Sequence, residues 1–151
     1  MDNITTAVHE AGHAWAYASQ RRSIRYLTVR PRTAGAVGMT KVRPKLVDSW
    51  DKSFSSIAGP IAEAVWSLET TDDPQAYFSW SDHFTGALLA GGHGDLEGIT
   101  PGVVDNEQVV EFIRDQIMRD WSRIIELAEL LADMRTVDGW TAALILRGER
   151  E

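Results

Sequence analysis

The fold of this chain is decided by a stretch close to its first residue, His9-Glu10-Ala11-Gly12-His13, which has the pattern H-E-x-x-H. On a helix, residues four apart lie on one face, one turn above the other. His9 and His13 would therefore present two imidazoles to one point, which is the spacing that a single zinc ion needs from one helix. Glu10 lies one step round the helix, where its carboxylate could reach a metal-held water without being a ligand itself. The pattern predicts a zinc hydrolase.

The residues around this pattern indicate a helix over residues 5–19. An apolar stripe at helical spacing is formed by Ile4, Val8, Ala11, Trp15 and Ala18. So short a pattern also occurs by chance, and two histidines at this spacing can be ordinary polar surface. The stripe argues against that alternative, because the histidine face borders the buried face. Glycine in a helix interior is less stable than alanine by about 1 kcal/mol. Gly12 is therefore explained best if another segment packs so closely against the helix that a larger side chain would not fit.

Composition indicates one globular domain over residues 1–151. Hydrophobic residues make up 44% and charged residues 25% of the 151 positions, which are ordinary globular values. The chain has no Cys, so only His, Asp, Glu and water are expected to hold a metal. No apolar run approaches the roughly 20 residues of a membrane span, and the first residues lack the order of a signal peptide. We therefore expect a cytoplasmic protein without a membrane span.

Charge is distributed unevenly along the chain. The net charge of −7 argues against general nucleic-acid binding. Eight of the fifteen basic residues nevertheless fall between Arg21 and Lys45, and no acid occurs between Ala11 and Val47. Such a basic strip could attract an acidic substrate or partner. More often such a strip is the solvent-exposed edge of a sheet, where the charges discourage pairing with a strand of another molecule.

The remaining periodicity predicts a mainly α (α+β) fold with a small β-hairpin or sheet. Strand composition is found in residues 23–30 and 39–42. Helical patterns are found in residues 53–68, 84–90, 106–134 and 139–146. Pro60 interrupts the first of these helices, which is then either kinked or a short turn running into a helix that begins at Pro60. Asp105 and Asp138 are expected to cap the last two helices.

A third zinc ligand has three candidates in the sequence. Glu63 could complete a site of two His and one Glu, although the usual fate of helix acids favours a carboxylate that caps a helix or holds a ligand in place. His93 and Asp95 lie in the glycine-rich run Gly91-Gly92-His93-Gly94-Asp95, where the backbone can approach another group closely. Asp95 could equally be an ordinary helix N-cap.

The order of these parts resembles the peptidase domain of the FtsH family, membrane-anchored AAA+ zinc proteases. The likeness is carried by Thr6 to Ala14, by Leu27 to Arg32 followed by Gly35 to Thr40, by Ile57 to Glu63, by Gly94 to Leu96, by Trp121 to Leu131 and by Thr136 to Gly139. The resemblance implies a helical zinc-peptidase domain with a small sheet packed by the metal-binding helix. It implies that His9, His13 and Asp95 bind Zn²⁺ and that Glu10 is the catalytic carboxylate.

These expectations describe a zinc-dependent metalloendopeptidase that hydrolyses unfolded or flexible protein segments. The sequence has no G-x-x-x-x-G-K-[ST] run, so we expect no use of ATP by the chain itself. The expected partners are a protein or peptide substrate and either further copies of this chain, as a homo-oligomer, or a separate ATPase. The alternative function is a catalytically inactive binding or regulatory module with the same fold. The intact Glu10 counts against that alternative, because a purely structural zinc site has no use for such a carboxylate. A metal held by four protein ligands, with His93 joining Asp95, would support it.

Overall fold

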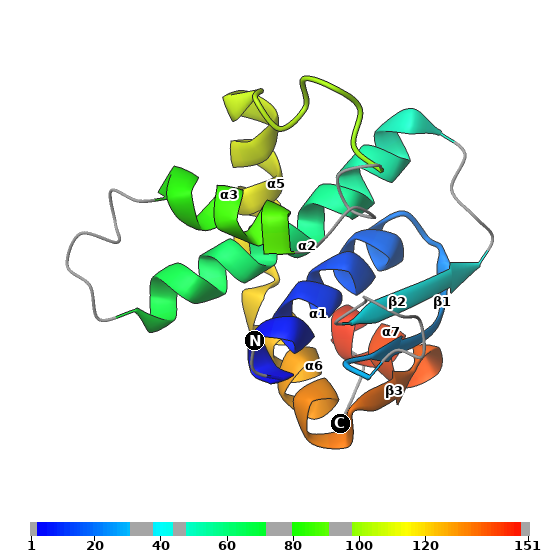
Figure 1. Cartoon of the computed structure of the whole chain (residues 1–151). Coiled ribbons are helices and arrows are strands. Elements are labelled where there is room, and N and C mark those ends of the chain that lie inside the picture. The colour runs from blue at the N-terminus through cyan, green and yellow to red at the C-terminus, as the bar shows by residue number, and fades with distance from the viewer. Residues whose placement is uncertain (1–2, 31–37, 44–47, 72–79, 91–97, 149–151) are drawn as a thin grey trace.

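The computed structural model describes residues 3–30, 38–43, 48–71, 80–90 and 98–148 (Figure 1). Its helices are α1 Asn3–Ser19, α2 Ser49–Thr70, α3 Trp80–Ala90, α5 Glu107–Arg119, α6 Trp121–Met134 and α7 Gly139–Arg147. Its strands are β1 Ser23–Thr28, β2 Met39–Arg43 and β3 Thr136–Asp138. The expectation of a mainly α (α+β) fold with a small sheet is confirmed.

Helix α1 is the central element of the molecule. It packs against α2 on one side and α6 on another, and it also contacts β1 and β2 (Figure 1). Its stripe of Val8, Ala11 and Trp15 is buried, as the helical spacing predicted. Because Ala residues dominate this surface, the neighbouring backbones can approach α1 closely. The H-E-x-x-H residues therefore lie at the centre of the fold.

The strands form one antiparallel sheet in the order β2-β1-β3. The predicted hairpin of β1 and β2 is present, with Leu27 opposite Thr40 and an extra residue on β1 between Ile24 and Tyr26. Strand β1 ends at Thr28, two residues before the predicted end, and the backbone N–H of Val29 donates instead to the Arg135 carbonyl. Among the described strands, β2 is paired on one side only. It is therefore an edge of the sheet, and Lys41 is exposed on it.

Strand β3 was not predicted, because three residues are too few to show an alternating pattern. It pairs with β1 through Leu27 opposite Val137. The turn before it contains Arg135 with a positive φ of 69°, and the Arg135 carbonyl also accepts a hydrogen bond from the Thr28 hydroxyl. Long-range pairing with β1 therefore creates this strand.

The single helix predicted for residues 106–134 is wrong: the chain breaks at Asp120 into α5 and α6. Asp120 has φ −106° and ψ 16°, and its carboxylate accepts a hydrogen bond of 2.9 Å from the Trp15 indole. The next residue, Trp121, donates its own indole N–H to Glu69 at 2.9 Å. The two halves pack against different partners, α5 on α2 and α6 on α1. The apolar period hid this break, because the stripe continues on both sides of it.

Other boundaries also differ from the prediction, and helix α3 begins at Trp80 instead of at residue 84. Asn106, and not Asp105, caps α5 by accepting from the Val109 N–H at 3.2 Å. Helix α2 begins at Ser49 and runs through Pro60 to Thr70, so the alternative in which Pro60 begins a new helix is wrong. Tertiary packing outweighs the backbone hydrogen bond that proline removes, because α2 is buried on both sides of Pro60. Among the described residues, no helix is long and apolar enough to cross a membrane.

Asp138 caps α7 as predicted, and this cap makes stability depend on pH. Its carboxylate accepts from the Thr141 backbone N–H and hydroxyl, each at 2.8 Å. The backbone hydrogen bond, followed by the hydroxyl, lowers the pKa of Asp138 below its ordinary 3.8. A lowered pKa means that the cap stabilises the fold fully above the unfolded pKa and less as pH falls through the folded pKa.

We expect Asp138→Ala to lower the free energy of unfolding by about 1 kcal/mol at pH 7, the usual cost of losing a cap. The difference from the unsubstituted protein should shrink below about pH 4, where the carboxylate of the unfolded chain is protonated. Urea unfolding at a series of pH values measures it. The matched control is Asp133→Ala on the exposed face of α6. A difference that stays constant down to pH 3 would contradict this assignment.

Candidate metal centre

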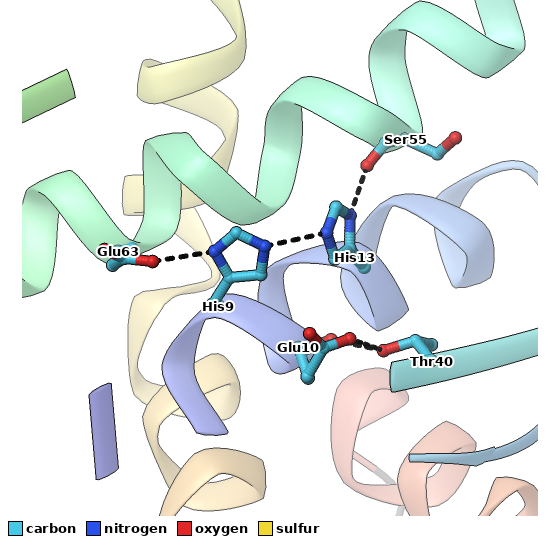
Figure 2. A network of polar contacts seen from close by, with 6 residues as sticks. All are labelled: His9, Glu10, His13, Thr40, Ser55 and Glu63. Carbon is cyan, nitrogen blue, oxygen red and sulfur yellow. Dashed lines mark hydrogen bonds and ion pairs between the residues drawn. The ribbon is translucent and has the colours of Figure 1, made fainter. Parts of the chain in front are cut away.

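His9 and His13 lie on consecutive turns of α1 and face each other (Figure 2). Their Nε2 atoms are 3.1 Å apart, and their ring planes are inclined at 72°. Both side chains are buried, with relative exposures of 6% and 7%. The helical spacing therefore directs the two imidazoles to one point, as the sequence predicted.

The other ring nitrogen of each histidine, Nδ1, lies at hydrogen-bonding distance from a group on α2. His9 Nδ1 lies 2.8 Å from Oε1 of Glu63, and His13 Nδ1 lies 2.7 Å from the backbone carbonyl of Ser55 (Figure 2). A carbonyl can only accept a hydrogen bond, so His13 Nδ1 carries the proton, and an ionised Glu63 demands the same of His9. The two Nε2 atoms lie within hydrogen-bonding distance of each other, at 3.1 Å. Either a proton or a metal ion between them would offset the repulsion of two facing lone pairs.

Glycines bring α1 and α2 close enough for these contacts. A Cβ atom on Gly12 would lie 2.7 Å from the Ala58 carbonyl oxygen and 2.7 Å from the Ala62 Cβ. A Cβ on Gly59 would overlap the His13 ring, 2.6 Å from Cε1 and 2.8 Å from Cδ2. The expectation that a segment packs closely against Gly12 is confirmed. The same approach places the His13 imidazole directly on the α2 backbone.

Glu10 is oriented by the edge strand. The Thr40 hydroxyl lies 2.8 Å from Oε1 of Glu10 and 3.0 Å from its backbone carbonyl (Figure 2). Gly38 lies just before β2, where a Cβ would be 2.9 Å from Cγ and 3.0 Å from Oε2 of Glu10. The Glu10 side chain is buried at 6% exposure. The carboxylate is therefore held in one orientation beside the two imidazoles.

The geometry fits a zinc ion held by the two histidines. Two nitrogens bound to one zinc at about 2.0–2.1 Å in tetrahedral geometry lie about 3.3–3.4 Å apart, and the Nε2 atoms are within a few tenths of an ångström of that separation. The potential ligand atoms of His9, Glu10 and His13 all lie within 4.8 Å of one another. Carboxylate and carbonyl acceptors on Nδ1 are the partners that orient metal-binding imidazoles in proteins.

The three candidates for a third ligand have different outcomes. Glu63 contacts the Nδ1 of His9, the nitrogen on the far side of the ring from His13. A carboxylate in this place orients the imidazole and is not itself a metal ligand. The sequence favoured such a role for Glu63 over that of a third ligand. Asp95 and His93 both lie outside the described residues. The assignment of Asp95 as the third ligand therefore stays a prediction.

Sequence reasoning missed three groups of this site. Thr40 was recognised as part of a strand but not as the partner of Glu10, and neither Gly38 nor the Ser55 carbonyl was singled out. These contacts join positions 30 and 42 residues apart in the chain. The only local signal used was Gly12, which indicated close helix packing but not its geometry. No family model matches this chain, and no curated protein is significantly similar to it.

Proposed function

We propose that this chain is a zinc-dependent metalloendopeptidase that hydrolyses peptide bonds in unfolded or flexible protein segments. The proposal is carried by one observation, the facing Nε2 atoms of His9 and His13 with the Glu10 carboxylate beside them. The resemblance of the sequence to the FtsH peptidase domain supports a peptide bond as the target. The FtsH likeness also suggests Asp95 as the third ligand, which would leave a fourth position open.

Bound zinc supplies a Lewis acid that polarises a peptide carbonyl and lowers the pKa of water toward about 7. Glu10 accepts a proton from the attacking water as the new C–O bond forms. It then returns this proton to the amine nitrogen as the C–N bond breaks. The Thr40 hydroxyl fixes one carboxylate oxygen, so the general base does not need to reorient during this transfer.

Glu63 and the Ser55 carbonyl have a different role in the proposal. Each holds the Nδ1 proton of one histidine and so keeps the Nε2 lone pair directed toward the ion. A buried carboxylate also raises the basicity of the imidazole to which it is bonded. These groups act on the metal through the histidines, and we regard them as positioning residues.

Strand β2 is the proposed platform for the substrate. It is an edge of the described sheet, and Thr40 within it contacts Glu10. An extended peptide could add to this edge through main-chain hydrogen bonds, which would place a backbone carbonyl near the two histidines. Only a segment without its own secondary structure can pair in this way. That requirement is our reason for proposing unfolded or flexible substrates.

A degradation assay with controlled metal content tests the function. The zinc-loaded chain should cleave an unfolded casein-type protein without ATP, a chelator should stop cleavage, and added Zn²⁺ should restore it. Zinc bound at full occupancy without cleavage would favour the inactive binding module. Cleavage that appears only when an ATPase is added would assign the chain as the peptidase subunit of a larger machine. Cleavage that persists in chelator would contradict a metallopeptidase.

A further inference from the structure

A cavity of about 670 Å³ is lined by residues of α3, of α5 and of the segment before α5. These two helices lie on the side of α2 away from the sheet (Figure 1). The apolar surface of the cavity comes from both helices and the segment before α5: Phe84, Leu88 and Val110 are buried, and Trp80 and Val104 are half-buried. Cavities of roughly 300–1,000 Å³ with apolar walls are the usual size of ligand sites. The cavity does not include His9, Glu10 or His13.

The rim of this cavity is acidic. Four exposed carboxylates line it, from Asp105, Glu107, Glu111 and Asp115, against one basic side chain, Arg114. The stretch of sequence that contains both helices has the same bias, because residues 46–118 contain thirteen Asp or Glu and only two Lys or Arg. Such a field attracts cations to the cavity and repels anionic ligands.

Arg114, the one cation on the rim among the residues that the structure describes, contacts an aromatic ring. The Arg114 guanidinium carbon lies 4.0 Å from the centroid of the Trp80 ring. Trp80 also stacks on Phe84, with centroids 5.8 Å apart and an interplanar angle of 7°. This contact demonstrates that the aromatic wall accepts a guanidinium. The Arg114 charge therefore lies against the ring, and the four carboxylates outnumber it on the rim.

We propose that this α3–α5 cleft binds a peptide segment in which Lys or Arg stands next to an apolar side chain. The apolar side chain fits between the buried Phe84, Leu88 and Val110, and the neighbouring cation reaches the carboxylates of Glu111 and Asp115. Charge complementarity selects this occupant over an acidic peptide, a nucleic acid or an anionic membrane. The proposal does not depend on zinc or on hydrolysis.

Fluorescence anisotropy with the full chain and a labelled peptide of repeated Gly-Arg-Leu tests the proposal. A chelator in the buffer removes zinc, so that the proposed zinc site cannot hydrolyse the labelled peptide. Glu111→Gln combined with Asp115→Asn should raise the dissociation constant about tenfold, since two rim charges are lost. The matched control is Glu129→Gln with Asp133→Asn, which has the same residue types, spacing and charge change on an exposed face of α6. The control should bind as the unsubstituted chain does.

The walls of the cleft are tested separately from its charge. Thr85 is exposed and lines the cavity, so Thr85→Trp should fill the cleft without disturbing the core and abolish binding. Peptides of repeated Gly-Arg-Ser and Gly-Glu-Leu should both bind at least about tenfold more weakly than Gly-Arg-Leu. The proposal would be overturned if Glu111→Gln with Asp115→Asn and the control pair Glu129→Gln with Asp133→Asn weakened peptide binding equally. Tight binding of Gly-Glu-Leu would also overturn it. Self-association that Glu111→Gln with Asp115→Asn abolishes, without peptide binding, would overturn it in favour of a second copy of the chain.

Discussion

Glu10→Gln is expected to reduce the rate of peptide hydrolysis about 10³-fold or more, the usual contribution of a general base, while leaving zinc content unchanged. Glutamine keeps the shape of the side chain, and its amide oxygen can still accept from the Thr40 hydroxyl, which lies 2.8 Å from Oε1 in the present structure. It cannot accept a proton from water at neutral pH. Fragment release from a casein-type substrate and elemental analysis of the same sample measure both consequences.

The control for this substitution is Glu129→Gln, which removes one carboxylate from an exposed position on α6. It should leave hydrolysis and zinc content at the level of the unsubstituted chain. Undiminished cleavage by the Glu10→Gln protein would assign proton transfer to another group. A parallel loss of zinc would show instead that Glu10 is a metal ligand. Its carboxylate is close enough for this alternative, because it lies within 4.8 Å of the ligand nitrogens of both histidines.

His13→Ala is expected to reduce bound zinc from about one ion per chain to a small fraction of one, because the proposed site loses one of its two imidazoles. The substitution also leaves the Ser55 carbonyl without the hydrogen bond that it accepts at 2.7 Å, and it opens space against Gly59. We therefore expect lower thermal stability as well as loss of hydrolysis. Zinc content after dialysis, with circular dichroism to verify folding, provides the measurement.

His83→Ala is the matched control for the loss of zinc. His83 lies on α3, where its Nδ1 is 2.6 Å from the Ser67 hydroxyl, and it does not belong to the group of potential metal ligands. Its removal should leave zinc content unchanged. Equal zinc content in the His13→Ala protein would place the metal elsewhere in the chain, and equal loss in both proteins would indicate general unfolding.

Local periodicity was sufficient to predict most helices and the hairpin. The apolar stripe of α1, the return strand at Thr40 and the Asp138 cap are each set by residues within a turn or two of one another, so they are visible in the sequence. The break at Asp120 was not, because it follows from hydrogen bonds to Trp15 and Glu69. Those residues belong to α1 and α2, far away in sequence.

The sequence by itself determined that two imidazoles meet on one face of one helix, since four-residue spacing is enough for that. Only the tertiary structure decided how the imidazoles and Glu10 are held. Glu63 lies 54 residues from His9, and Thr40 lies 30 residues from Glu10. No spacing rule connects such positions. The contacts exist because Gly12 and Gly59 let two helices approach to backbone distance, and because strand β2 then packs beside the first of them.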